Sequence, residues 1–206
     1  MISGDKGRAV EALFARRTPP IDDLAARAED VARACHAMAV RFQAGGKLVV
    51  FGNGESSTDA QHVAVEFVHP VIVGKRALPA ISLTSDVASL TGIAQRHGFA
   101  DTFAHQLRTL ADPDDMALGL SSDGNCENVL TALRVARGLG MLTIALVGGD
   151  GGAIAAAGAA DHCLVARSCD PRVVKEVQVT SYHILWELVH VFFEHPGVLQ
   201  PRVVAG

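Results

Sequence analysis

The sequence predicts an α/β fold, a three-layer α-β-α sandwich built on a doubly wound, five-stranded parallel sheet. From Lys47 onward, short apolar runs alternate with helical segments, as in proteins whose parallel strands are joined by helices. Two longer segments with helical periodicity flank this region. A chain of 206 residues, 49% of them apolar, is long enough for one such domain, which we expect to span residues 1–206.

Residues 1–45 are predicted to be helical. A short helix is expected over about residues 5–17. After two prolines, residues 21–45 repeat apolar side chains at helical spacing and stop at Gly45-Gly46, which predicts one long amphipathic helix. Together with the C-terminal helix, this segment carries more apolar surface than one small sheet can cover. We therefore expect residues 1–45 to take part in forming a homo-oligomer.

Residues 46–206 are expected to form the α/β core. Its five strands are predicted from the apolar runs KLVVF at 47–51, LPAISL at 78–83, DMALGL at 115–120, MLTIALV at 141–147 and DHCLVA at 161–166. In such sheets, ligands bind at the carboxyl ends of the strands, near a switch in strand order. A final helix is predicted over residues 171–196, with Pro171 in its first turn.

Composition excludes several classes of partner. The formal charge of −4 is spread along the chain without a basic stripe, so neither nucleic acid nor a membrane surface is an expected partner. The four cysteines show no C-x-x-C spacing and too low a density for a disulfide-stapled secreted domain. The sequence contains no signal peptide pattern and no apolar run of membrane-spanning length. We expect a soluble cytoplasmic protein.

The segment FGNGESSTDAQH, residues 51–62, follows the first expected strand. Its Gly-Asn-Gly turn and Ser56 lie where a helix N-terminus offers N–H groups and hydroxyls to an anion. An equally consistent interpretation is a strand-to-helix turn capped by Ser57 or Thr58. Glu55 places a carboxylate in the same loop, which would repel an anion. The segment therefore predicts an anion site and also argues against one.

A second turn of similar composition is LGLSSDGNCENV, residues 118–129. Ser121 and Ser122 supply hydroxyls between an expected strand and an expected helix, which is again the geometry of a phosphate contact. The alternative is that Asp123 or Asn125 caps the helix. Two such loops in one sheet strengthen the prediction of an anion site.

Four side chains on two expected helices form a third candidate group. His62 and Glu66 are four residues apart and share a helix face, and the spacing of Glu176 and His183 keeps them on roughly one face as well. Two histidines with carboxylates can bind a divalent cation or share proton transfer. We interpret the other histidines and Trp186 as surface or packing residues.

These segments resemble the sugar isomerase (SIS) domain and, within it, the sedoheptulose-7-phosphate isomerase subfamily, also called phosphoheptose isomerases. The resemblance covers nearly the whole chain and includes QAGGK, GNG followed by DAQH, LPAISL, GFADTF, LSSDGN, GMLTIAL followed by GGDGG, and YHIL. It implies a homotetramer with active sites at subunit interfaces. It also implies conversion of a ketose phosphate, sedoheptulose 7-phosphate, to the aldose D-glycero-D-manno-heptose 7-phosphate. No nucleotide or organic cofactor is expected.

The resemblance implies that Glu66 is the base between C1 and C2 and that His183 is its partner acid or base. Relatives also bind zinc, which here would use His62, Glu66 and His183. The fourth family ligand is a glutamine, but alignment from YHIL places Lys175 there. Because an ammonium group cannot ligate zinc, we expect Lys175 to act as a fixed positive charge that pairs with Glu66 or stabilises an enediolate. Glu176 is the alternative fourth ligand.

The resemblance further implies a set of substrate-binding residues. These are Asn53, Gly54, Glu55, Ser56, Gln95, Arg96, Ser121, Ser122, Asp123, Cys126 and Lys175.

Several residues of this set depart from the family pattern. The family has glycine at the position of Glu55, serines at Asp123 and Cys126, and an Asn-Asp pair at Gln95-Arg96. A carboxylate 4 Å from a phosphate opposes binding by about 4 kcal/mol at an effective dielectric near 20. Phosphate could still bind if Glu55 points to solvent, if Asp123 caps its helix, or if Arg96 compensates the charge.

Three functions are consistent with these residues. The first is an isomerase of a seven-carbon or related sugar phosphate, which the presence of Glu66 and His183 supports. The second is an SIS enzyme with a different, less anionic sugar substrate, which Glu55 and Asp123 favour. The third is a non-catalytic module that binds a phosphosugar and acts through protein contacts, like the initiator-associating members of the subfamily. Those relatives generally lack the catalytic acid and base.

Overall fold

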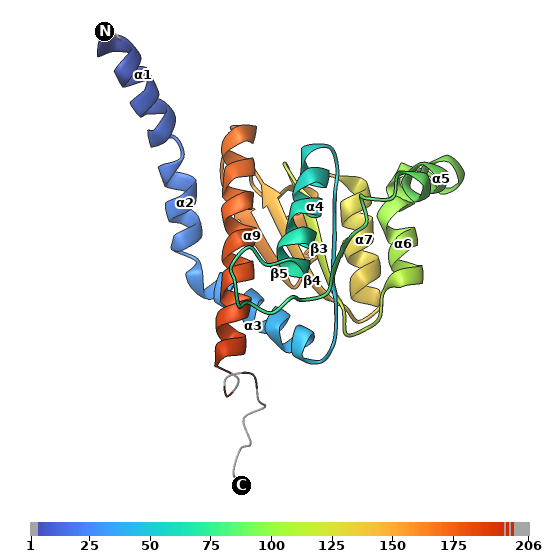
Figure 1. Ribbon diagram of the computed structural model, residues 1–206. Coiled ribbons are helices and arrows are strands. Elements are labelled where there is room, and N and C mark those ends of the chain that lie inside the picture. Colours follow the sequence, from blue (N-terminus) through green and yellow to red (C-terminus); the bar gives the residue numbers. More distant parts are fainter. Residues whose placement is uncertain (1–3, 196, 198, 200–206) are drawn as a thin grey trace.

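The computed structural model describes residues 4–195, 197 and 199, and within them the chain forms one sheet of five parallel strands (Figure 1). The strand order is β2-β1-β3-β4-β5. The strands are β1 (Leu48–Gly52), β2 (Ala80–Ser82), β3 (Met116–Ser121), β4 (Leu142–Gly148) and β5 (His162–Ala166). The predicted fold class and the five strands are confirmed, and β2 is shorter than its apolar run.

The order of the strands fixes where ligands can enter. β1 lies between β2 and β3, so the connection after β1 runs toward one edge of the sheet and later connections run toward the other. The carboxyl ends of β1 and β3 are adjacent, because Gly52 pairs with Leu120 in the parallel register. The Gly-Asn-Gly turn and the Ser-Ser-Asp-Gly turn are therefore neighbours at the switch point.

Two apolar clusters cover the two faces of the sheet. On one face, strand residues such as Val50 and Leu118 pack against α3 (Ala28–Gln43), α4 (Glu55–Val68) and α9 (Pro171–Glu194). On the other face, Val49 and Ala117 pack against α6 (Thr102–Leu110), α7 (Glu127–Gly138) and α8 (Gly152–Ala156). Successive side chains along each buried strand point to opposite faces of the sheet, so each strand contributes to both apolar clusters and the fold has three layers. The helix α5 (Val87–His97) and the 3₁₀ turn η1 (Phe99–Asp101) lie before α6.

The prediction of one long helix over residues 21–45 is wrong. The chain instead forms α2 (Thr18–Ala25) and α3, which are separated near Arg27. The Arg27 guanidinium binds the Asp23 carboxylate at 2.6 Å and the Val165 carbonyl at 2.8 Å, which ties the break to the end of β5. Apolar periodicity continues across such a break, so the sequence pattern did not reveal it. Ahead of α2, the predicted short helix is present as α1 (Gly4–Ala15).

The predicted C-terminal helix is confirmed as α9 up to Glu194, and Pro196 lies outside the described residues. Asp170 begins the helix by accepting a hydrogen bond from the Arg172 backbone at 3.1 Å, and Pro171 occupies the first turn. Hydrogen bonding to Arg172 lowers the pKa of the Asp170 carboxyl to about 2. In the part of the chain described here, none of the helices combines the length and apolar character needed to cross a membrane.

Gly148, at the carboxyl end of β4, should not tolerate a side chain. A Cβ there would lie 2.0 Å from the Ser122 carbonyl oxygen and 2.5 Å from Val174. We predict that Gly148→Ala lowers the free energy of unfolding by about 1–3 kcal/mol because the loop backbone must move. Urea denaturation measures the change.

Gly92→Ala is the matched control, since nothing lies within 4 Å of a Cβ built there in the middle of α5. It should raise the free energy of unfolding by about 0.5–1 kcal/mol. Equal effects of the two substitutions would contradict the steric explanation.

Candidate active site at the switch point and between α4 and α9

The Gly-Asn-Gly turn joins β1 to α4 and is held to the neighbouring loop by an amide pair. Gly54 takes φ 55°, a conformation that favours glycine, and serves as the N-cap of α4 without a side-chain cap. The expected capping by Ser57 or Thr58 is therefore wrong; their hydroxyls donate to the Gly54 and Glu55 carbonyls instead. The Asn53 and Asn128 amides exchange hydrogen bonds of 2.7 and 2.9 Å, so Asn53 is fixed toward α7.

Glu55 and Ser56, in the first turn of α4, differ in their exposure to solvent. Ser56 is buried and Glu55 is exposed. Among the described residues, the Glu55 carboxylate makes no hydrogen bond or ion pair. Its position is consistent with the expectation that it points to solvent.

Asp123 accepts hydrogen bonds within its own turn. Its Oδ1 accepts from the Asn125 backbone N–H at 2.9 Å and from the Ser121 hydroxyl at 3.2 Å. The Ser121 oxygen in turn accepts from the Gly124 backbone N–H at 3.0 Å. Two N–H groups that could face an anion are thus already bonded within the loop.

The helix after this turn is capped differently from the prediction. The N-cap of α7 is Cys126, which makes no side-chain cap, so neither Asp123 nor Asn125 caps it. Asn125 instead accepts from the Ala153 backbone N–H at 3.0 Å. Ser122 and Cys126 are half-buried beside the turn.

A cavity of about 410 Å³ opens beside the Gly-Asn-Gly turn. Its wall includes Asn53, Gly54 and Thr84, and the helix α5 closes it with Thr91 and Ala94. The volume falls within the range of small-molecule sites. This cavity is the space that the Gly-Asn-Gly turn offers to a ligand, whereas Asp123 and Asn125 of the other turn line a different cavity.

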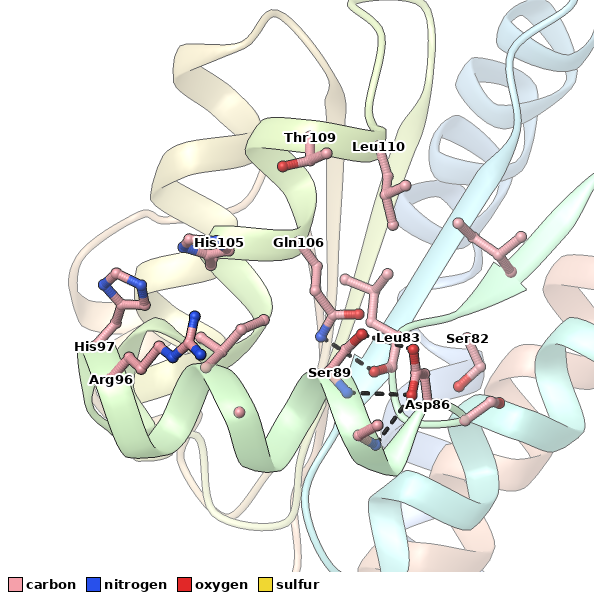
Figure 2. Close-up of a pocket in the computed structure, with 15 residues that line it drawn as sticks. Ser82, Leu83, Asp86, Ser89, Arg96, His97, His105, Gln106, Thr109 and Leu110 are labelled. Atoms are coloured by element: carbon pink, nitrogen blue, oxygen red, sulfur yellow. Dashed lines mark hydrogen bonds between the residues drawn. The ribbon is translucent and has the colours of Figure 1, made fainter.

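Arg96 does not face this cavity. It lines a second cavity on the other side of α5, together with His97 and His105 (Figure 2). Gln95 is exposed and lines neither cavity. Within one chain, therefore, Arg96 does not compensate the charge of Glu55 or Asp123.

His62, Glu66 and His183 converge where α4 packs against α9. One potential ligand atom from each side chain lies within 4.8 Å of the others. His62 Nε2 is 3.2 Å from Glu66 Oε1, and the rings of His62 and His183 lie edge to face with centroids 5.4 Å apart. The Glu66 side chain is 11% exposed, whereas that of His62 is 43% exposed. A shielded carboxylate between two imidazoles can exchange protons with a ligand or hold a divalent cation.

Tyr182 fixes the orientation of His62. The Tyr182 hydroxyl is 2.8 Å from His62 Nδ1, so the other ring nitrogen faces Glu66. Burial raises the pKa of the Tyr182 phenol, with smaller contributions from Asp59 and Glu66. The phenol consequently stays protonated at neutral pH and can donate to the ring or accept from it.

Trp186 anchors Glu66 through its backbone. The indole Nε1 donates to the Glu66 carbonyl at 2.8 Å, and the side chain is buried in the core. The predicted packing role of Trp186 is confirmed.

Lys175 pairs with Asp59, and the expected pair with Glu66 is not formed. Its Nζ lies 2.7 Å from Asp59 Oδ2 and 3.4 Å from the Glu55 carbonyl. The Asp59 carboxylate is 7% exposed, so the cation neutralises a charge that is largely shielded from water. Lys175 thus sits one helical turn before the His62 and Glu66 pair, beside α4.

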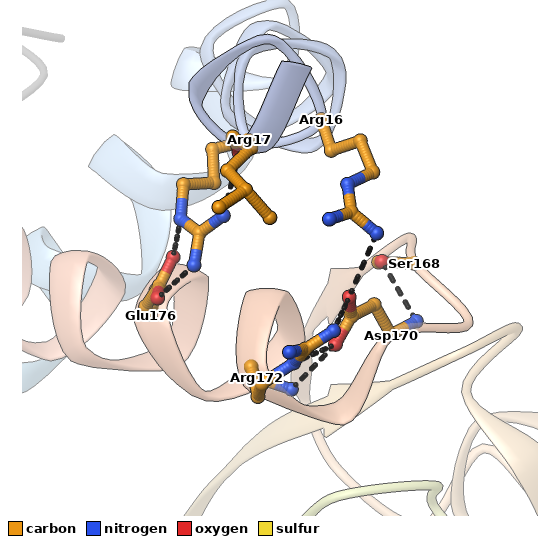
Figure 3. Close-up of polar contacts among 7 residues, drawn as sticks. Arg16, Arg17, Ser168, Asp170, Arg172 and Glu176 are labelled. Carbon is orange, nitrogen blue, oxygen red and sulfur yellow. Dashed lines mark hydrogen bonds and ion pairs between the residues drawn. The ribbon is translucent and has the colours of Figure 1, made fainter. Parts of the chain in front are cut away.

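Glu176 is not the alternative fourth ligand. Its carboxylate binds the Arg17 guanidinium at 2.7 and 2.8 Å, while Arg16 approaches Asp170 at 3.8 Å (Figure 3). These contacts hold the junction of α1 and α2 against the first turns of α9. Glu176 therefore supports the N-terminal helices.

Four residues of the site were missed in the sequence: Asp59, Asn128, Gln178 and Tyr182. Asp59 and Tyr182 lie within quoted motifs, and the helical spacing of Asp59, His62 and Glu66 could have suggested one polar face. The Gln178 amide donates to the Ser121 and Leu146 carbonyls at 3.0 and 3.1 Å. A contact between residues so distant in sequence has no local signal.

Comparisons with known proteins identify the family to which this chain is similar. The SIS domain family model matches residues 20–148. The phosphoheptose isomerase of Solidesulfovibrio magneticus is 42% identical over 84% of this chain and 84% of that protein. The phosphoheptose isomerase of Pelobacter propionicus is 40% identical over 88% of this chain and 90% of that protein.

Solved structures of phosphoheptose isomerases share the fold. The structure from Francisella tularensis has a TM-score of 0.82 at 31% identity and covers 93% of this chain and 100% of its own. The structure from Neisseria gonorrhoeae has a TM-score of 0.80 at 30% identity and covers 89% and 97%.

Proposed function

This chain belongs to the phosphoheptose isomerases of the SIS domain family, and we propose that it interconverts a ketose phosphate and an aldose phosphate. The proposed substrate is sedoheptulose 7-phosphate or a close analogue, and the product is D-glycero-D-manno-heptose 7-phosphate. The observation that carries the proposal is the convergence of Glu66 with His62 and His183 on the facing sides of α4 and α9. A non-catalytic module has no need of such a group.

The reaction moves one proton between neighbouring carbons. Glu66 takes a proton from C1 of the ketose, which leaves an enediolate across C1 and C2, and then returns a proton to C2. His183 donates a proton to the C2 oxygen and accepts one from the C1 oxygen. The low exposure of the Glu66 side chain supports its role, because a shielded carboxylate exchanges its proton slowly with solvent.

We propose zinc as the metal of this site, with His62, Glu66 and His183 as ligands. Two imidazoles and a carboxylate are a donor set of catalytic zinc sites, and their donor atoms lie within 4.8 Å of one another. When bound, the ion would polarise the substrate oxygens. Tyr182 supports this assignment because its hydroxyl oxygen can accept a hydrogen bond from His62 Nδ1–H and leave Nε2 free for the ion.

We also propose that the chain acts as a cytoplasmic homotetramer through its N-terminal helical segment, residues 1–45. On α1, the apolar side chains of Val10, Leu13 and Phe14 are 51%, 41% and 69% exposed in the single chain. A second copy would cover such a surface. The four free cysteines support a reducing compartment.

A second candidate function is an SIS enzyme on a less anionic sugar. It is favoured by the turn at Asp123, where the carboxylate occupies the Asn125 N–H and the Ser121 hydroxyl. Those donors would otherwise be available to a phosphate.

Substitution of Glu66 by glutamine tests the first function. We predict that Glu66→Gln lowers kcat by about 10²–10⁴-fold, because the amide cannot take the carbon proton. Turnover of sedoheptulose 7-phosphate and exchange of its C1 protons in deuterated water measure the effect. Glu187→Gln, an exposed position on α9, is the control and should leave the rate unchanged. Equal turnover of sedoheptulose 7-phosphate by both variants would contradict the assignment.

Substitution of Asp123 by serine tests the second function. We predict that Asp123→Ser strengthens phosphosugar binding by about tenfold or more, because it removes a negative charge and releases two donors. Isothermal titration with sedoheptulose 7-phosphate measures the affinity. Asp150→Ser, at the neighbouring loop, controls for net charge alone. If the Asp123 variant binds no better than the control, the turn does not limit phosphate binding.

Substitution of Lys175 by glutamine tests the influence of the ion pair on metal binding. We predict that Lys175→Gln tightens zinc binding by about tenfold, because it removes a cation beside Asp59 and supplies an amide at the position where the family has its fourth ligand. Competition with a chromophoric chelator measures the zinc affinity. Lys75→Gln is the control, because Lys75 pairs with Glu194 at the other end of α9. Unchanged zinc affinity in Lys175→Gln would show that Lys175 lies outside the reach of the metal.

A further inference from the structure

A second cavity, of about 650 Å³, lies between the end of β2, α5 and α6. It is separate from the cavity at the Gly-Asn-Gly turn because α5 divides them. Gly92, Ile93 and Arg96 face the second cavity, whereas Thr91 and Ala94 face the first. Its volume is that of a small-molecule site. The mechanism above uses none of the residues on this side of α5.

One end of the second cavity carries the Arg96 guanidinium and two imidazoles. Arg96 and His97 come from the last turn of α5 and His105 comes from α6, and Figure 2 shows the three side chains at the same end. The imidazoles of His97 and His105 stack with centroids 4.7 Å apart. The guanidinium of Arg96 has no hydrogen bond or ion pair with any residue in the described part of the chain.

The acid nearest this end does not neutralise it. Asp101 is 3.6 Å from His105 Nδ1, but its carboxylate is also held by Arg108 at 2.9 and 3.0 Å. Arg96 therefore supplies a cation without a carboxylate partner in the described part of the chain, beside two stacked imidazoles that can donate hydrogen bonds. An anionic group would find complementary charge there.

The other end of the cavity offers hydroxyls and acceptors. Ser82 and Ser89 lie there around Asp86, as Figure 2 shows. The Asp86 carboxylate caps α5 by accepting from the Ala88 and Ser89 backbone N–H groups at 3.0 and 3.1 Å. A negative charge at this end would repel an anion and accept hydrogen bonds from neutral hydroxyls.

Gln106 adds a directed acceptor between the two ends. The residue is 8% exposed, and its amide nitrogen donates to the Leu83 and Thr102 carbonyls at 3.3 and 3.0 Å. The amide oxygen then has no donor partner among the residues that the structure describes, although the side chain lines the cavity. A ligand hydroxyl would supply that donor.

We propose that this second cavity binds a phosphorylated polyol, with its phosphate at Arg96, His97 and His105 and its hydroxyls toward Gln106 and Asp86. The two ends are separated along α5, since the interval from Asp86 to Arg96 rises about 15 Å at 1.5 Å per residue. An elongated molecule with its charge at one terminus fits this polarity. A compact inorganic anion would use only the end at Arg96.

Two small residues on opposite faces of α5 provide a matched pair of variants. Nothing lies within 4 Å of a Cβ built at Gly92, so Gly92→Leu should fill the second cavity without a backbone clash. Ala94→Leu should fill the first cavity instead. Thermal unfolding checks that both variants are folded. Arg96→Met removes the unpaired guanidinium and provides a second route if Gly92→Leu fails to fold.

Calorimetric titration of the full chain with sorbitol 6-phosphate tests the proposal. This probe has no carbonyl and cannot be isomerised. We expect binding that persists in Ala94→Leu and that weakens by at least about tenfold in both Gly92→Leu and Arg96→Met. Inorganic phosphate should bind about tenfold more weakly than the ester, and uncharged sorbitol more weakly still.

Three results would overturn the proposal. They are the absence of binding to the wild type, loss of binding in Ala94→Leu with full binding in Gly92→Leu, and equal affinity for inorganic phosphate and the ester. Isomerase turnover is measured separately on the wild type and Gly92→Leu. Loss of the proposed isomerase function would therefore leave the binding result intact, and the two failures are distinguishable.

Discussion

The parallel packing of α4 on α9 is the contact on which the candidate active site depends. Three polar contacts follow one another along it: Lys175 to Asp59, Tyr182 to His62, and Trp186 to the Glu66 carbonyl. On α4 they are spaced at about one helical turn, and on α9 at about two turns and then one, so they fix both the rotation and the register of the two helices. His183 meets Glu66 only in this register. The chemistry of the site is therefore a consequence of helix packing, and it requires no irregular loop.

Local partners hold two of the charges that set this chain apart from its family, those of Lys175 and Asp123. Lys175 neutralises Asp59, and Asp123 accepts donors of its own turn. Each charge is placed beside a complementary group within the same chain, which lowers the cost of shielding it from water. The substitutions thus act on neighbouring protein groups before they act on any ligand. They alter which hydrogen-bond donors remain free for a ligand more than they alter the net charge of the pocket.

Much of the fold could be predicted from the sequence, because buried parallel strands and amphipathic helices leave periodic signals. The five strands and α9 were found in this way. The break near Arg27 was not, since it depends on a contact with the Val165 carbonyl on β5. In the site, the shared face of His62 and Glu66 followed from helical spacing, and the family resemblance added His183. Lys175 was assigned to the wrong carboxylate, because Asp59 and Glu66 share that face and only packing decides which one a neighbouring helix reaches.

The helix α5 is the element that both cavities share. It contains no fully buried residue, and its first turn is held by the Asp86 cap. A ligand that covers a helix with little buried surface adds most to the stability of that helix, because the rest of the chain makes few contacts with it. A molecule in either cavity would bury one face of α5 and restrict the same helix. The helix α5 therefore links the cavity beside the Gly-Asn-Gly turn to the cavity beside Arg96. The two cavities share no lining residue among those that the structure describes.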